Sequence, residues 1–114
     1  MAIQNWSDDI IVVALGDDPQ FSDDLTALTE GIEAKARDVV LNFAAVGFIN
    51  SSNIAKLLRL RKEMLGSNKN LVLCGVNTQV WGVFMVTGLD KIFQFTNDIS
   101  TALATLQLAG DKGD

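Results

Sequence analysis

The hydrophobic and polar positions along the chain follow two different periods. Short apolar runs rich in β-branched residues and bounded by polar residues are typical of buried strands, and they predict strands at residues 10–15, 38–43 and 69–76. Elsewhere apolar residues recur every three or four positions, which places them on one face of a helix, and this pattern covers residues 25–36, 54–65, 80–87 and 99–106. Two shorter segments with β propensity lie at residues 2–6 and 91–95.

The order of these segments predicts an α/β fold. Two strands come first, separated by the polar residues 7–9, which indicate a hairpin turn. Helices then alternate with strands, and such alternation favours parallel pairs joined by right-handed crossovers. We therefore expect one domain over residues 1–114, with a mixed sheet of four to five strands, an N-terminal antiparallel hairpin and about four helices. Residues 110–114 are expected to form a disordered tail.

Capping residues predict where the helices begin and end. Ser22, followed by two aspartates, predicts the start of the first helix, and the pairs Asn77-Thr78 and Asn97-Asp98 predict the starts of the third and fourth. Gly88 is expected as the left-handed residue that ends the third helix. The buried face of the second helix should consist of Ile54, Leu57, Leu58, Met64 and Leu65, with Lys56, Arg59, Lys62 and Glu63 on the opposite side.

The junction between the strand at 38–43 and the helix at 54–65 contains the polar sequence Asn50-Ser51-Ser52-Asn53. Asn and Ser are preferred N-cap residues because their side-chain oxygens accept hydrogen bonds from amides that the first helical turn leaves unpaired. Two serine hydroxyls therefore lie at the positive end of a helix, at the edge of an α/β sheet where ligands usually bind. Helix capping alone is the alternative explanation of this pattern.

The third helix has two apolar rows that are offset by one position. The expected core row is Val80, Val83, Phe84 and Thr87, and the second row is Trp81, Met85 and Leu89. A surface helix rarely needs both rows. The second row is therefore either a partner-binding surface or further core, and the exposure of Trp81 distinguishes these alternatives.

Composition removes several classes of function. The net charge of −5 and the pI near 4.5 argue against a nucleic-acid surface, which requires clustered Lys and Arg. The chain has no histidine, which excludes Ser-His-Asp and Cys-His catalysis and histidine metal sites. Cys74 lies in an apolar run, as expected of a buried, reduced thiol. No apolar run reaches the roughly 20 residues of a membrane span and no signal peptide is evident, so we expect a cytoplasmic protein without membrane insertion.

Two candidate chemistries find little support in the residue pattern. The aspartates at 17, 18, 23 and 24 could bind a hard cation, but their spacing matches no calcium-loop signature, and a solvated turn and helix start is the preferred interpretation. Ser51 or Ser52 could be a nucleophile only with a base within hydrogen-bond reach, and neither a Gly-x-Ser-x-Gly elbow nor a phosphate loop is present. We therefore predict no catalytic residue, metal or cofactor.

Three segments together resemble a known family. They are the Asn-Ser-Ser-Asn loop at 50–53 that opens a Leu-rich helix, the strand at 71–76, and Thr-Gly-Leu-Asp-Lys-Ile-Phe at 87–93. In combination they resemble the STAS domain of anti-sigma factor antagonists, over residues 38 to about 106. The resemblance implies a STAS-like mixed sheet and a protein partner.

The resemblance also implies a role for the serines. The family loop normally reads Asp-Ser-Ser-Gly, and a kinase that is also the anti-sigma factor phosphorylates its second serine, which is Ser52 here; Ser51 is the second choice. The unphosphorylated domain binds the anti-sigma factor, and phosphorylation breaks the complex. Asn50 stands in place of the family's Asp and Asn53 in place of its Gly, which motivates the alternative of a non-phosphorylated adaptor in a stress-signalling or lipid-transport complex.

The expected partner-binding residues come from two helices. The partner is expected to be an anti-sigma factor with serine kinase activity, and a homodimer is left open. Lys56, Arg59 and Lys62 could receive an acidic partner surface, with a solvated helix face as the preferred interpretation. The full predicted set is Asn50, Ser51, Ser52, Asn53, Lys56, Arg59, Trp81 and Met85.

Overall fold

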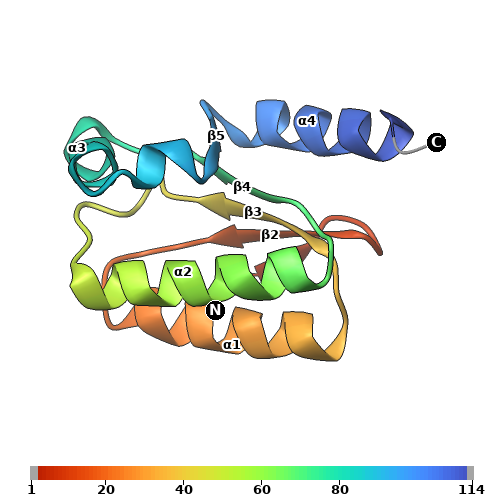
Figure 1. Ribbon diagram of the computed structural model, residues 1–114, viewed down its shortest axis with the longest axis horizontal. Helices are drawn as coiled ribbons and strands as arrows, with labels where there is room; N and C mark the ends of the chain where they lie inside the picture. Colours follow the sequence, from red (N-terminus) through yellow and green to blue (C-terminus); the bar gives the residue numbers. More distant parts are fainter. Residues whose placement is uncertain (1–2, 113–114) are drawn as a thin grey trace.

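A computed structural model describes residues 3–112, with the side-chain environments of residues 3–108. Five strands form one sheet in the order β1-β2-β3-β4-β5 (Figure 1). The strands are β1 (Ile3–Asn5), β2 (Ile10–Ala14), β3 (Asp38–Asn42), β4 (Leu71–Cys74) and β5 (Gln94–Thr96). The helices are α1 (Gln20–Ala34), α2 (Ser51–Gly66), α3 (Thr78–Thr87) and α4 (Ile99–Lys112), with a short 3₁₀ helix, η1 (Leu89–Lys91).

The pairing of the strands confirms the predicted mixed sheet. β1 is antiparallel to β2, whereas β2–β3, β3–β4 and β4–β5 are parallel. The expected disordered tail at 110–114 lies partly in α4, which continues to Lys112, and residues 113–114 lie outside the described part of the chain. No described helix is both long and apolar enough to cross a lipid bilayer.

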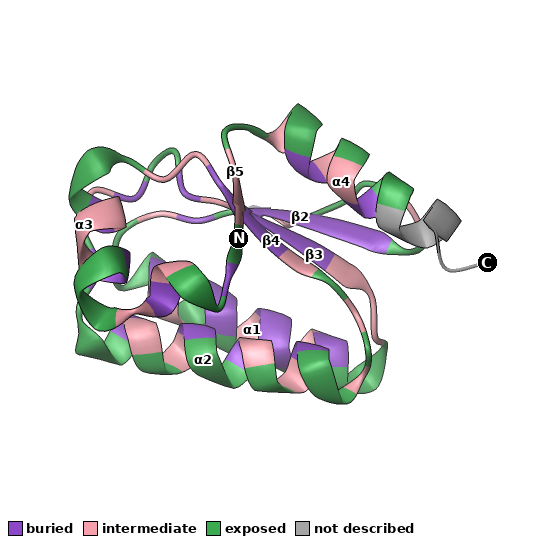
Figure 2. Cartoon of the chain, turned by 45° about the horizontal axis from the view of Figure 1, so that its top comes forward, coloured by how far each residue is buried: buried purple, intermediate pink, exposed green. Residues whose placement is uncertain are grey.

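Two apolar layers lie on opposite faces of the sheet, because successive residues of a strand point to opposite sides. On β3, Val39 and Leu41 join the layer under α1, α2 and α3, whereas Val40 joins the layer under α4. Figures 1 and 2 show α1 and α2 side by side on one face and α4 on the other. The larger layer contains Phe43, whose ring meets those of Phe21 and Phe84 edge-on at centroid distances of 5.9 and 6.0 Å.

The last strand begins later than the sequence predicts. Gly88 is left-handed (φ 78°), as expected, and ends α3. The chain then forms η1, in which the amide of Phe93 bonds the carbonyl of Leu89 at 3.2 Å, instead of continuing as a strand from residue 91. Leu89 and Phe93 are both 7% exposed. Their burial on successive turns favours a helical turn over an extended chain, so β5 starts only at Gln94.

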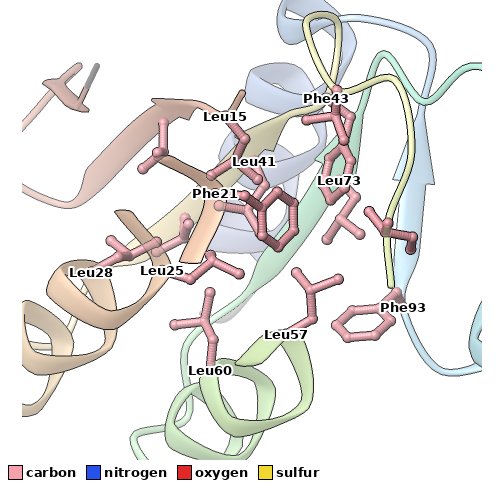
Figure 3. Packing of buried hydrophobic residues seen from close by; sticks show 14 of the residues in the cluster. Leu15, Phe21, Leu25, Leu28, Leu41, Phe43, Leu57, Leu60, Leu73 and Phe93 are labelled. Atoms are coloured by element: carbon pink, nitrogen blue, oxygen red, sulfur yellow. The ribbon is translucent and has the colours of Figure 1, made fainter. Parts of the chain in front are cut away.

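Helices α1 and α2 also differ in detail from the prediction. α1 starts at Gln20 rather than after Ser22, and Pro19 is its N-cap residue. On α2 the buried side chains are Leu57, Leu60 and Met64, while Leu58 and Leu65 are 38% and 61% exposed. The predicted stripe was therefore wrong at two positions. Figure 3 shows Leu57 and Leu60 pointing from α2 into the core beside Phe21.

Helix α3 buries fewer residues than expected. Val80 and Phe84 are buried, but Val83 is half-buried and Thr87 is exposed. The hydroxyl of Thr87 donates to the carbonyl of Val83 at 2.8 Å, which satisfies this polar group on the solvent side. The expected N-cap role of Asn77 is confirmed, since its Oδ1 accepts from the amide of Val80 at 2.7 Å.

Candidate partner-binding site

Asn50 and Asn53 form a reciprocal cap at the start of α2. Oδ1 of Asn50 accepts from the amide of Asn53 at 2.9 Å, and Oδ1 of Asn53 accepts from the amide of Asn50 at 3.0 Å. This capping box satisfies two of the four amides that the first turn leaves unpaired. The two residues that lie between the partners of the cap, Ser51 and Ser52, are both exposed. The cap therefore does not use either serine, and both hydroxyls are open to a visiting protein.

Asn53 connects α2 to the start of α1. Its Nδ2 donates to Oδ2 of Asp18 at 2.8 Å, and Asp18 also accepts from the amide and the hydroxyl of Ser22 at 2.9 and 2.7 Å. Hydrogen bonds from the side chains of Ser22 and Asn53 lower the pKa of Asp18 below its usual 3.8. Asn53 is only 2% exposed, so its predicted role as a partner contact is wrong. Its side chain acts inside the molecule.

The aspartates before and in α1 have structural partners. Oδ1 of Asp17 accepts from the amide of Gly47 at 2.8 Å and so holds the loop that leads to α2. Asp24 is 3% exposed, so the expectation of four solvated aspartates is wrong at this position. Within the described residues, no group of three or more candidate ligands is arranged to hold a metal ion. Asp17 and Asp18 thus tie the start of α1 to the loop and to α2.

Ser52 shares one stripe of α2 with two cations. Lys56 and Arg59 follow it at four and seven residues, a spacing that keeps all three on the same side of a helix. Lys56 and Arg59 line a cavity of about 80 Å³ between α1 and α2, together with Glu30. Ser51 lies about 100° away from this stripe around the helix. Of the two serines, Ser52 is therefore the one aligned with positive charge.

Phe48 is a residue of this site that the sequence analysis did not single out. It lies in the loop two residues before Asn50 and is 57% exposed, whereas its neighbour Ile49 is 7% exposed and anchors the loop in the core. An exposed aromatic side chain next to open hydroxyls is typical of a surface that binds protein. The sequence could have indicated this residue, because Phe48 and Ile49 are adjacent apolar residues outside any strand and only one of the two side chains needs to be buried.

Trp81 and Met85 lie on α3 and have different environments. The ring of Trp81 is half-buried and meets the ring of Phe95 edge-on at a centroid distance of 5.0 Å. Trp81 also lines a cavity of about 350 Å³ at the carboxyl ends of β4 and β5. Met85 is 55% exposed and its neighbour Val86 is 89% exposed. Of the second row of α3, Trp81 is thus partly packed, Met85 faces solvent and Leu89 lies in the core.

The N-cap residue of α3 is hydrogen-bonded to the loop before α2. Nδ2 of Asn77 donates to the carbonyl of Val46 at 3.0 Å. Both helices begin at the carboxyl edge of the sheet, as Figure 1 shows. The fold therefore brings the serines and α3 to the same edge, although Trp81 and Met85 belong to a different helix from the Ser52 stripe.

Cys74 is buried at the end of β4, in the layer under α4. Burial, with a smaller contribution from the negative charge of Asp98, raises the pKa of its thiol to about 11. A thiol with this pKa is protonated at neutral pH and is a poor nucleophile.

Comparison with known proteins places this geometry in context. A family model described as the STAS domain matches residues 19–102. A Ser-to-Glu variant of RsbS from Moorella thermoacetica has a similar structure, with 19% identity, a TM-score of 0.82 and 96% of each chain covered. The anti-sigma factor antagonist SpoIIAA in its unphosphorylated form has 16% identity and a TM-score of 0.78, over 92% of this chain and 94% of that one.

A third similar structure is an anti-sigma-factor antagonist (STAS) domain protein from Planctomyces limnophilus. It has 20% identity and a TM-score of 0.75, over 86% of this chain and 91% of that one. At these identities the structural likeness establishes the fold: a five-stranded mixed sheet with four helices, of the kind found in anti-sigma factor antagonists.

Proposed function

The chain belongs to the STAS domain family, and we propose that it is a protein-interaction module that binds an anti-sigma factor through the start of α2. The observation that carries this proposal is the pair of exposed serines, Ser51 and Ser52, in a helix start whose cap does not need them. Phe48 adds an exposed apolar contact beside them. Such a role would be carried out in the cytoplasm, with no reaction catalysed by this chain.

We further propose that Ser52 is the switch residue. A kinase partner would transfer the γ-phosphoryl group of ATP to Oγ of Ser52, while the hydroxyl proton passes to a base of the kinase and ADP leaves. The phosphate brings about −1.5 to −2 charges. Lys56, four residues further along α2, would pair with it, and the helix dipole favours negative charge at this end. Phosphorylation would then stabilise α2.

The same charge would weaken the complex. A partner that approaches the Ser52 stripe with acidic groups for Lys56 and Arg59 would meet the phosphate instead, and repulsion and desolvation would both oppose binding. Asn50 replaces the usual aspartate of the loop, but Asp18 holds a carboxylate against Asn53 at the same helix end. Asp18, in the turn before α1, thus supplies a negatively charged group close to the loop.

The test uses purified protein, the cognate kinase and ATP. Mass spectrometry should show one added phosphate, absent in Ser52→Ala and retained in the matched control Ser51→Ala. Calorimetry should show that Ser52→Glu binds the kinase at least about tenfold more weakly than Ser51→Glu. Unmodified Ser52 in the presence of a competent kinase would rule out the switch, and absence of binding by the unphosphorylated protein would rule out the whole proposal.

A second function is favoured by the exposed side chains of α3. Met85 and Val86 are exposed apolar side chains on a different helix from the Ser52 stripe, which suits a constitutive adaptor in a stress-signalling or lipid-transport complex. Recovery of an ATPase or permease from native lysate, lost with Met85→Ala and kept with Ser52→Ala, would support the adaptor. Recovery of the sigma-regulating kinase alone would support the first function.

A further inference from the structure

Charge is distributed unevenly along the chain. Residues 51–94 carry six Lys or Arg against two Asp or Glu, a net charge of +4. The remaining residues carry three Lys or Arg against twelve Asp or Glu, a net charge of −9, and the two parts account for the total of −5. The protein is therefore acidic overall, but α2 and the turn that follows it, which carry this whole excess of +4, form a basic side, with the neutral η1 beside the end of α2.

The basic side contains a cavity at the C-terminal end of α2. The cavity has a volume of about 170 Å³, and its lining includes Arg61, Leu65, Lys69 and Ile92. No acidic residue lines it. Leu65 and Ile92 are 61% and 41% exposed, so two large apolar side chains lie open to solvent at the same cavity as two cations. We call these four residues the α2–η1 surface.

Contacts within the protein hold this surface in place. Nε of Arg61 donates to the carbonyl of Ile92 at 3.3 Å, which fixes the guanidinium beside the cavity and leaves its other N–H groups to bind a carboxylate. The amide of Lys69 donates to the carbonyl of Met64 at 3.0 Å, across a turn in which Asn68 is left-handed (φ 58°). The guanidinium of Arg61 and the backbone of Lys69 are thus held in place, which lowers the entropy lost on binding.

We propose that the α2–η1 surface binds an acidic peptide segment of a protein partner, with one apolar side chain in the cavity and carboxylates at Arg61 and Lys69. The volume is below the range of drug-sized ligand sites, so it suits a single side chain better than a cofactor. Leu65 lies about 20 Å along α2 from Ser52. The surface is therefore separate from the proposed switch, and its binding does not depend on that function.

The charge distribution favours a peptide over an anionic membrane. A membrane would attract the basic side but repel the rest of the chain, which has a net charge of −9. A membrane also presents no single side chain that would fill a concave site. A peptide can place its carboxylates at the two cations without approaching the acidic remainder of the molecule.

The test measures fluorescence anisotropy of the full chain with labelled 12-residue peptides, in which one Leu is flanked by Asp and Glu at several spacings. At least one peptide should bind saturably at 50 mM salt, about the concentration at which screening of surface charges is moderate. Lys69→Glu should raise its Kd about tenfold, because an ion pair is replaced by repulsion. Leu65→Ser should also raise the Kd, without any change in charge.

The matched control is Lys35→Glu, which changes the net charge from −5 to −7 just as Lys69→Glu does, but at the end of α1. It should change the Kd less than twofold. An equal loss of affinity in Lys69→Glu and Lys35→Glu would show that only the overall charge matters, and would overturn the proposal. Absence of saturable binding would also overturn it. Binding to phosphatidylserine vesicles in place of the peptides would overturn it too. Should Lys69→Glu fail to fold by circular dichroism, Arg61→Gln replaces it, with Lys35→Gln as the control of equal charge change; Arg61→Gln should raise the Kd and Lys35→Gln should not.

Discussion

The side chain of Asn53 makes two structural contacts at the start of α2. Its side chain completes the capping box with Asn50, and its Nδ2 reaches Asp18 at 2.8 Å. Both contacts are made by a residue that is 2% exposed, where an unpaired amide would be costly. The polar side chain is therefore tolerated in the interior because its hydrogen bonds are formed, and it positions the exposed serines beside it.

The contact between Asp18 and Asn53 predicts a dependence of stability on pH. The pKa of Asp18 is lower in the folded chain than its usual 3.8, so its contribution is complete above about pH 5 and is lost as the pH falls through the folded pKa. Asp18→Asn should therefore lower the thermal midpoint at pH 7, and its effect should become progressively smaller as the pH falls below 3.8. Circular dichroism melts of the wild type and the variant at several pH values measure this.

The control for this prediction is Asp8→Asn, which removes an exposed carboxylate in the hairpin turn. At pH 7, Asp8→Asn should change the thermal midpoint much less than Asp18→Asn does. A difference between wild type and Asp18→Asn that stays constant down to pH 2.5 would show that the carboxylate form of Asp18 contributes nothing specific.

At the scale of the element, the orientation of α2 determines which of its side chains are available. Leu57, Leu60 and Met64 are at most 1% exposed and face the sheet, so Leu65 and the stripe of Ser52 face solvent. The inward position of Asn53 is in phase with these residues at a spacing of three or four. The orientation of α2 about its axis thus determines which of its residues belong to the core, to the proposed switch and to the α2–η1 surface.

Two leucines of α2 test this orientation. Leu60→Ala should reduce the free energy of unfolding by about 2–5 kcal/mol, because it leaves a cavity in a packed layer. Leu65→Ala should change it by about 0.5 kcal/mol or less, since the side chain is 61% exposed. Urea denaturation of both variants measures the difference, and comparable losses would contradict the observed face of the helix.

At the scale of the whole molecule, the sheet separates two apolar layers of unequal size. The layer under α1, α2 and α3 contains most of the buried aromatic rings, while the layer under α4 consists of a few aliphatic side chains and Cys74. The smaller layer has less apolar area with which to resist opening. We therefore expect α4 to separate from the sheet more readily than the other helices.

The rate at which the buried thiol of Cys74 is labelled measures this opening of α4. Leu106→Ala should increase the rate of native-state labelling of Cys74 by a disulfide reagent at least about tenfold, because it removes a buried side chain of the α4 layer. Leu28→Ala, at the same 2% exposure but in the other layer, should increase it less for an equal loss of global stability. Labelling should also accelerate as the pH rises toward the thiol pKa of about 11. Equal labelling rates in the two variants would mean that α4 opens only with the whole fold.

The sequence alone determined the order of the elements, the antiparallel start and parallel remainder of the sheet, and the helix ends at Asn77, at Gly88 and at the pair Asn97-Asp98, of which Asp98 is the cap. These features follow from residue spacing and from hydrogen bonds between near neighbours, which are readable locally. Tertiary structure decided that the polar loop of α2 buries Asn53 and exposes Ser51 and Ser52, because Asn53 meets Asp18 from 35 residues away. It also set the face of α2 and the start of β5, since both depend on which side chains the rest of the core can accommodate.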